Sequence, residues 1–116
     1  MIQHYAYFRQ RFADALDPAW QSITEIDEKV RTDDCLMWAD GETALLCEIR
    51  DLPMGPVLFG LVCCGDMEVL RSELQPLVEQ TAKDIGCKGI AFCGRVGWAR
   101  AMPDYKVVQI VALKEF

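Results

Sequence analysis

The amino-acid sequence predicts an α/β domain built on a mixed five-stranded sheet flanked by helices. Three observations lead to this fold class. The run Val57–Cys63 is almost wholly apolar, as expected of a strand that is buried on both faces. A long helical pattern follows from Met67 to Ile85, and a second short apolar run, Gly89–Cys93, comes after it. This order predicts a right-handed crossover that makes the two strands parallel.

The helical pattern between these strands has recognisable ends and one flaw. Asp66 stands where a side chain can cap the first turn, and Gly86 stands where a left-handed residue ends a helix. Pro76 lacks an amide hydrogen, so we expect a kink at Ser72 or a second helix that starts there. The face of this helix that is expected to meet the sheet consists of Leu70, Leu74, Leu77, Val78, Thr81 and Ile85.

Two amphipathic helices are expected before the sheet. The first is indicated by apolar side chains three and four residues apart, at Tyr5, Phe8, Phe12 and Leu16. The pair Asp17-Pro18 predicts the start of the second, because an N-cap residue precedes a proline at the first helical position. The apolar face of this second helix is marked by Trp20, Ile23, Ile26 and Val30.

The remaining strands are indicated by turn residues. Asp40-Gly41 is a strong hairpin signal between the strand-like runs Cys35–Ala39 and Thr43–Ile49. The segment Arg50–Pro56 holds two prolines and a glycine and is predicted to be a loop. After the crossover unit, Gly94–Met102 is predicted to form a short helix. The apolar run Val107–Leu113 is then the fifth and last strand.

Composition and charge narrow the class of protein. The chain has 116 residues, which suits one domain, 1–116, with half of its residues apolar and a quarter charged. A net charge of −6 argues against broad nucleic-acid binding. No apolar run approaches the roughly 20 residues of a membrane-spanning helix. The segment Met1–His4 lacks the layout of a signal peptide, so we expect a cytoplasmic location.

The sequence contains six cysteines, at positions 35, 47, 63, 64, 87 and 93. Five lie in or beside apolar runs, where a free cysteine behaves as a small hydrophobic residue. No C-x-x-C pair occurs, and His4, the single histidine, is remote in sequence from all of them. We therefore favour reduced core thiols over a zinc site or disulfides, and expect no metal.

The order of elements is similar to that of the Gcn5-related N-acetyltransferases, the GNAT fold. The resemblance is sharper in the C-terminal half, at Ile85–Ile90 (IGCKGI) and Gly94–Tyr105 (GRVGWARAMPDY). These stretches resemble small GNAT-like proteins encoded by tailed bacteriophages. The resemblance covers about half of the chain by motif and most of it by element order.

A working GNAT enzyme implies acetyl-CoA in a splayed gap between the two central strands, here Val57–Cys63 and Gly89–Cys93. The residues that this would place at the cofactor are Leu61, Val62, Cys63 and Gly65. It also implies a glycine-rich pyrophosphate loop at the start of the long helix, where backbone amides and the helix dipole favour an anion. Only Cys64-Gly65-Asp66 stands there, so we expect no cofactor unless the protein is an active enzyme.

The catalytic residues that the resemblance implies are also weakly represented. Acetyl transfer by a GNAT enzyme needs a base for the amine and often a tyrosine acid. The tyrosine position falls near Ala101, and Tyr105, about a turn later, is the remaining candidate unless it packs the helix end. Glu48 is the carboxylate nominated as base. The favoured alternative for Glu48 is a solvent-facing strand residue.

Arg95, Trp98 and Arg100 form a candidate binding patch for a phosphate, a peptide carboxylate or a partner surface. The alternative, which we favour, is that Trp98 packs on the sheet and the arginines are solvated or paired with Asp104.

Two classes of function follow from these residues. The favoured one is a GNAT-like phage protein without efficient catalysis, which acts as a binding, virion or assembly component. Its partner would be a phage or host protein, or a second copy of the chain, in the host cytoplasm or the virion. The alternative is an N-acetyltransferase that acts on an unknown amine. An apolar surface patch would favour the first, and a cleft would favour the second.

Overall fold

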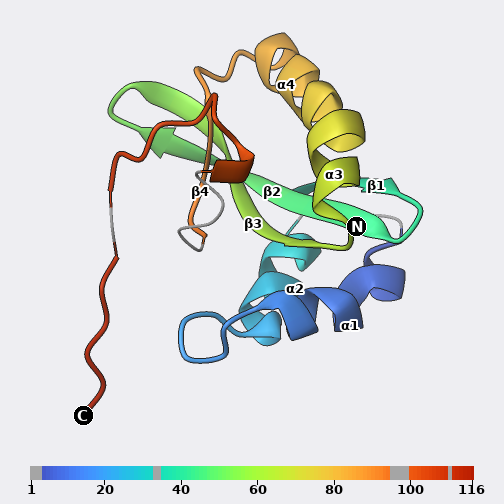
Figure 1. Cartoon of the computed structure of the whole chain (residues 1–116), viewed down its shortest axis with the longest axis vertical. Coiled ribbons are helices and arrows are strands. Elements are labelled where there is room, and N and C mark those ends of the chain that lie inside the picture. Colours follow the sequence, from blue (N-terminus) through green and yellow to red (C-terminus); the bar gives the residue numbers. More distant parts are fainter. Residues whose placement is uncertain (1–3, 33–34, 95–99, 110) are drawn as a thin grey trace.

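The computed structural model describes residues 4–32, 35–94, 100–109 and 111–116. Its helices are α1 (Tyr5–Ala15), α2 (Ile23–Arg31), α3 (Met67–Val69) and α4 (Gln75–Asp84), with a wide π-helical turn, η1 (Leu70–Leu74), between α3 and α4. Its strands are β1 (Cys35–Asp40), β2 (Thr43–Leu52), β3 (Gly55–Cys64) and β4 (Ile90–Phe92). They form one sheet in the order β1-β2-β3-β4 (Figure 1).

The sheet is mixed, as expected, and helices lie on both of its faces. β1, β2 and β3 are antiparallel neighbours, and β4 pairs parallel to β3. Figure 1 shows α1 and α2 on one side of the sheet and the α3–α4 segment on the other. Each side has its own apolar cluster. Phe8, Phe12, Ile26 and Leu46 belong to the cluster under α1 and α2, and Leu58, Val78 and Ala82 to the one under α4.

The second helix does not begin where the sequence predicts. The carboxylate of Asp17 accepts the amide two residues further on, at 3.0 Å, and holds a turn rather than a helix start. α2 begins at Ile23, where the hydroxyl of Ser22 accepts the amide of Glu25 at 3.3 Å. Trp20 is 53% exposed and lies in the turn. The prediction was wrong because serine caps a helix as well as aspartate does.

The two hairpins differ in how well they were predicted. The expected hairpin joins β1 to β2, but Asp40 pairs with Thr43 and the two turn residues are Gly41-Glu42, with Gly41 at a φ of 59°. The predicted loop 50–56 is wrong, because Leu52 pairs with Gly55 and only Pro53-Met54 lies outside the strands. Gly55 has a φ of 123°, which lets the chain reverse in so short a connection.

The long helical segment has both of its expected ends. The carboxylate of Asp66 accepts the amide of Glu68 at 2.8 Å, and Gly86 has a φ of 84°. The irregularity expected near Pro76 is also present. The amide of Gln75 donates to the carbonyl of Leu70, which closes the wide turn, and α4 begins at Gln75. Pro76 therefore lies in the first turn of a new α-helical segment, where a missing amide hydrogen is tolerated.

The prediction of a fifth strand at Val107–Leu113 is wrong for the residues that the structure describes. Residues 107–109 and 111–113 are in no strand, and Val107, Val108, Val111 and Leu113 are all more than half exposed. Figure 1 shows the C-terminal segment running away from the sheet. An apolar run reports strand propensity, but a strand also needs a neighbour to pair with.

Two further expectations concern the short helix after β4 and membrane-spanning segments. The predicted short helix Gly94–Met102 lies mostly outside the described residues, and Arg100 and Ala101 are helical. No helix in the described part of the chain has both the length and the apolar content that a membrane span requires.

Candidate functional site

β4 is much shorter than β3 and pairs with only part of it. Their parallel pairing joins only Leu58–Gly60 to Ile90–Phe92, and β3 then continues to Cys64. Leu46 lies opposite Val62 but Cys47 lies opposite Gly60, so Leu61 is an extra residue in β3. A bulge of this kind bends a strand and increases its twist. Among the described residues, β3 has no strand on its β4 side from Leu61 to Cys64, whereas β2 continues along its other side.

The four residues predicted to meet a cofactor divide into two groups. Leu61 and Val62 are buried in the cluster under α1 and α2. Cys63 and Gly65 instead border a cavity of about 330 Å³ at the start of α3. The whole lining of this cavity is Ala15, Cys63, Cys64, Gly65, Asp66, Met67 and Leu70. The cavity stands at the position that the GNAT resemblance gives to a pyrophosphate.

The connection between β3 and α3 is closed by contacts within the chain. The amide of Asp66 donates to Oγ1 of Thr43 at 3.0 Å, and the carboxylate of Asp66 accepts the amide of Glu68 at 2.8 Å. Gly65 packs so tightly that a Cβ atom on it would lie 2.5 Å from Oγ1 of Thr43. None of the described residues that line the cavity has a cationic side chain. The residues present thus do not fit a pyrophosphate, because two amides are already bonded and the local charge is negative.

Glu48 lies on the α1/α2 side of the sheet and is buried, so the expectation of a solvent-facing residue was wrong. Its side chain is 9% exposed and bridges Nζ of Lys29 and Nε of Arg50, each at 2.7 Å. Burial alone would raise the pKa of Glu48, but the hydrogen bonds from Lys29 and Arg50 lower it below 4.5 overall. A general base works best with a pKa near the operating pH. This arrangement suits a carboxylate that joins α2 to the sheet.

Tyr105 lies on the opposite side, against α4 and β4. Its hydroxyl accepts a hydrogen bond from the side-chain amide of Gln75, and its ring centroid is 5.3 Å from that of Phe92. Burial raises the pKa of Tyr105 to about 12, although the bond from Gln75 opposes the shift. Glu48 contacts α2 and Tyr105 contacts α4, so the structure does not bring the two nominated catalytic residues together.

A second cavity, of about 390 Å³, lies between the helical segment 67–84 and residues 101–105. Tyr105 and Gln75 form part of its wall, with Glu68, Glu79 and Asp104 as its acidic residues. Among the described residues that line it, Arg71 is the one basic residue, and it is paired with Glu68 at 2.7 Å. The described part of the lining is therefore predominantly acidic, which disfavours phosphate-bearing ligands.

The cysteines are free thiols, and burial makes three of them poor nucleophiles. Burial raises the pKa of Cys63 to about 11 and that of Cys47 to about 12, and it also raises the pKa of Cys64. A reactive cysteine needs the opposite shift, because the thiolate is the nucleophile. In the part of the chain that the structure describes, no three metal-ligating side chains are grouped.

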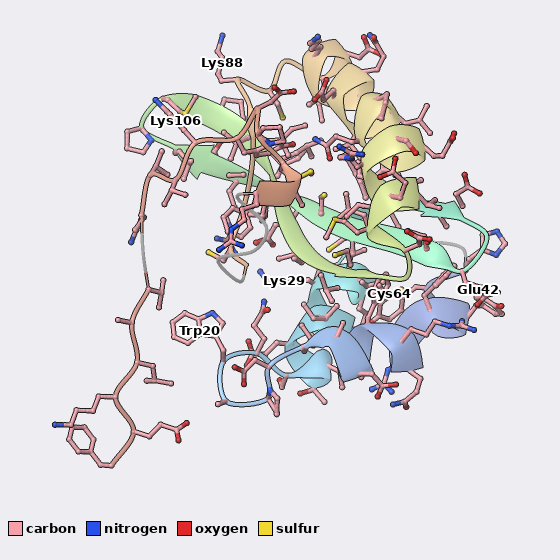
Figure 2. The ribbon with its side chains drawn as sticks, viewed as in Figure 1. Trp20, Lys29, Glu42, Cys64, Lys88 and Lys106 are labelled. Carbon is pink, nitrogen blue, oxygen red and sulfur yellow. The ribbon has the colours of Figure 1, made fainter. Side chains whose placement is uncertain are left out.

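The predicted binding patch is described only in part. Arg95 and Trp98 lie outside the described residues, and Arg100 is exposed. Sequence reasoning missed a different surface group, in which Glu42 of the β1–β2 turn accepts the hydroxyl of Tyr7 at 2.6 Å and also pairs with Arg11. Figure 2 shows Glu42 at the end of the sheet beside α1. Tyr7 and Glu42 are 35 positions apart, so no local sequence pattern could have predicted their contact.

Comparisons with known proteins bear on the fold. No protein-family model matches the chain, and no curated protein matches it in sequence. A solved probable acetyltransferase is similar in structure, with a TM-score of 0.65, 10% identity and coverage of 99% of this chain and 96% of that one. A predicted acetyltransferase from Clostridium acetobutylicum, solved with acetyl-CoA, has a TM-score of 0.60, 11% identity and coverage of 99% and 88%. The fold is GNAT-like.

A third similar structure, a protein from Thermus thermophilus, has a TM-score of 0.61, 15% identity and coverage of 95% of this chain and 92% of that one. Identities this low show a shared fold and do not carry an activity from one chain to another. The sheet of this GNAT-like chain has four strands in the described residues, where the sequence predicted five.

Proposed function

We propose that this chain is a GNAT-fold binding protein that does not catalyse efficient acetyl transfer from acetyl-CoA. The observation that carries the proposal is the start of α3. There the carboxylate of Asp66 bonds the amide of Glu68, and the amide of Asp66 bonds Thr43. A pyrophosphate at this position would meet the negative charges of Asp66 and Glu68 and would find these two amides already bonded.

The nominated catalytic groups support the same proposal. Glu48 is held as a carboxylate by two cations and is a weak base, and Tyr105 is bonded to Gln75 on the other side of the sheet. The thiols of Cys63 and Cys64 have raised pKa values, so neither offers a ready thiolate. No described pair of groups resembles a base and an acid that converge on one substrate.

The more specific part of the proposal, the biological role of the binding protein, rests on the resemblance of Gly94–Tyr105 to phage proteins. It supports a virion or assembly component, with a phage or host protein as partner and the host cytoplasm or virion as location. The exposed apolar side chains of Val107, Val108, Val111 and Leu113 also support association, since a large exposed apolar surface usually marks an interface.

An N-acetyltransferase is the second candidate, and a specific observation favours it. β3 runs past its pairing with β4, and no strand in the described part of the chain covers its β4 side from Leu61 to Cys64. An extended cofactor arm could bond along such an edge as a strand does. The Clostridium acetobutylicum neighbour was solved with acetyl-CoA, which is consistent with this use of the fold.

Calorimetry with acetyl-CoA, and with coenzyme A as a control, separates the two candidates. We expect no binding heat from the full chain at about 1 mM ligand, where a dissociation constant in the micromolar range would saturate the site. Micromolar binding of acetyl-CoA would overturn the proposal, and turnover of Glu48→Gln and Tyr105→Phe variants should then be measured.

The role of Asp66 can be isolated with a matched pair of variants. Asp66→Asn keeps a side-chain acceptor for the Glu68 amide but removes the charge. Asp84→Asn makes the same change of net charge at the far end of α4. If Asp66 excludes the pyrophosphate, coenzyme A binding should strengthen in Asp66→Asn and not in Asp84→Asn. Equal behaviour of the two variants would show that Asp66 is not the excluding group.

A further inference from the structure

Two cationic side chains share one buried carboxylate on the α1/α2 side of the sheet. Oε2 of Glu48 accepts a hydrogen bond from Nζ of Lys29, which reaches from α2 to the sheet (Figure 2), at 2.7 Å. Oε1 accepts one from Nε of Arg50, also at 2.7 Å. The side chain of Glu48 is 9% exposed, whereas those of Lys29 and Arg50 are 40% and 41% exposed. The carboxylate is therefore enclosed, while both cations remain accessible from solvent.

This group differs from the other ion pairs in the described residues by its balance of charge. Each of the others joins one cation to one carboxylate, namely Arg9 to Asp27, Arg11 to Glu42, Arg31 to Glu28 and Arg71 to Glu68. Here two positive charges meet one negative charge, in a chain whose net charge is −6. The unbalanced positive charge makes this place attractive to an anion.

The guanidinium of Arg50 is held in place with most of its donors unused. Its Cζ atom lies 3.6 Å from the ring centroid of Phe59, so the ring supports the planar group. Arg50 donates to Glu48 through Nε. Within the described part of the chain, its terminal nitrogens Nη1 and Nη2 have no hydrogen-bond partner. These two nitrogens form the fork that binds a carboxylate through two parallel hydrogen bonds.

The neighbouring strands make this arrangement rigid. Glu48 stands opposite Phe59 in the pairing of β2 with β3, and Arg50 stands opposite Val57. Since Glu48 and Phe59 already order Arg50, a ligand would not have to restrict this side chain on binding. Lys29 is bonded to the other oxygen of the same carboxylate and has further N–H donors on Nζ.

We propose that Arg50 and Lys29 form a binding site for a carboxylate group, with Arg50 as the two-fold donor and Lys29 as the second cation. One unbalanced positive charge matches the single negative charge of a carboxylate. Peptide chains and small organic acids both carry this group, and the two sources are distinguished by experiment. Arg50 pairs near the start of β3, whereas the connection to α3 follows the end of β3, so the proposal holds whether or not acetyl-CoA binds.

The test is a titration of the full chain with sodium acetate at constant ionic strength, followed by NMR. The resonances to follow are Nε–H of Arg50 and the backbone amides of residues 48–50. We expect a saturable shift with a dissociation constant on the order of 10 mM, because a small probe gains little from a half-exposed ion pair. Acetamide has the shape of acetate without its charge and should cause no saturable shift.

Three variants assign the binding to Arg50. Arg50→Gln removes the fork and should weaken acetate binding about tenfold or more. Arg50→Lys keeps the charge without the paired donors and should weaken it about threefold to tenfold. Arg31→Gln makes the same change of net charge on α2, where Arg31 is paired with Glu28, and should change the affinity less than about twofold. Circular dichroism checks that each variant is folded.

N-acetylglycine places the same carboxylate beside a peptide amide and separates the two sources. Binding about fivefold or more tighter than that of acetate would support the carboxyl end of a peptide chain as the ligand, because the amide then adds contacts. Equal affinities would support a small organic acid. Both results require that Arg50→Gln weakens binding and that Arg31→Gln does not.

Three results would overturn the proposal. The first is the absence of a saturable shift up to about 200 mM acetate, well above the expected dissociation constant. The second is equal weakening by Arg50→Gln and Arg31→Gln, which would show that net charge alone attracts the anion. The third is inorganic phosphate binding about tenfold more tightly than acetate at the same ionic strength, which would exclude a carboxylate as the preferred group.

Discussion

The two faces of the sheet differ in how they are filled. Under α1 and α2 lie the rings of Phe8 and Phe12, with Glu48 bonded to α2 at the edge of that cluster. Under α4 the buried residues of the cluster are Cys47, Leu58, Val78 and Ala82, none of them aromatic, and the two cavities described above include residues of the helical segment 67–84. The α1/α2 face thus buries aromatic rings, whereas the cavities lie beside the segment 67–84. A small-molecule site is therefore to be sought on the α3–α4 side.

The largest expected effect tests this difference with one truncation on each face. Phe12 and Val78 both have 0% of their surface exposed. Phe12→Ala should lower the free energy of unfolding by about 3–5 kcal/mol, because it removes a ring from a closely packed cluster. Val78→Ala removes only two methyl groups and should lower it by about 1.5–2 kcal/mol. Urea denaturation of both variants measures the contrast, and equal losses would contradict it.

The connection from the sheet to α3 should be nearly as sensitive. Gly65 has a φ of 100°, and a Cβ atom there would lie 2.6 Å from Cα of Thr43. Gly65→Ala should therefore cost about 2–4 kcal/mol, because backbone atoms must move. Gly41→Ala is the control, since φ is 59° but no atom lies within 4 Å, and it should cost only about 1 kcal/mol. Thermal and urea unfolding give both values, and similar losses would show that the contact with Thr43 is not decisive.

Glu48 gives an intermediate effect with a pH dependence. Glu48→Gln removes the charge between Lys29 and Arg50, whose side chains are 40% and 41% exposed, so solvent limits the loss to about 1–2 kcal/mol. Because the pKa of Glu48 is lowered, its stabilisation is complete above its ordinary value of 4.5 and is lost as the pH falls through the lower folded value. The difference between the wild type and Glu48→Gln should thus be constant near neutrality and shrink below pH 4.5.

Unfolding by urea from about pH 3 to pH 8 checks this dependence. Glu28→Gln serves as the control, because its partner Arg31 and Glu28 itself are both well exposed, and it should change stability little at any pH. A difference for Glu48→Gln that grows as the pH falls would have the wrong sign for a lowered pKa.

The smallest expected effects compare the caps of the two helical layers. Asp66→Ala and Ser22→Ala each remove a side-chain acceptor for a backbone amide and should each cost about 1 kcal/mol. The bond from Glu68 to Asp66 measures 2.8 Å and that from Glu25 to Ser22 measures 3.3 Å, so the loss at Asp66 should be the larger. Chemical denaturation of the two variants provides the comparison, and a larger loss at Ser22 would reverse it.

The sequence predicted the parts of the fold that depend on local pattern. The spacing of Tyr5, Phe8 and Phe12 indicated α1, Asp40-Gly41 indicated the first hairpin, and Gly86 indicated the end of the long helix. Each of these signals lies within a few residues, and local sterics and periodicity are sufficient to produce it. The errors at Asp17 and at Val107–Leu113 arose where competing caps, or the presence of a neighbouring strand, decide the outcome.

The candidate site was less accessible to sequence reasoning. The short acidic connection at Gly65-Asp66 was visible, but its contact with Thr43 joins residues 23 positions apart. The pairing of Glu48 with Lys29 spans 19 positions, so a residue expected in solvent proved to be buried. The roles of these side chains depend on which helix packs on which face, and that information is distributed over the whole chain.

The wide turn Leu70–Leu74 sets the rotation of everything that follows it. The buried apolar side chains of the helical segment recur every four residues, at Leu70, Leu74, Val78 and Ala82, and the polar Gln75 is buried beside them. In a regular α-helix each step of four residues overshoots a full revolution by about 40°, so such a stripe would wind off the sheet. The turn closed from Gln75 to Leu70 has more residues per revolution and offsets part of this overshoot. Deleting a single residue from it would let the segment continue as a regular α-helix, which would remove this compensation and change the rotation of α4 against the sheet.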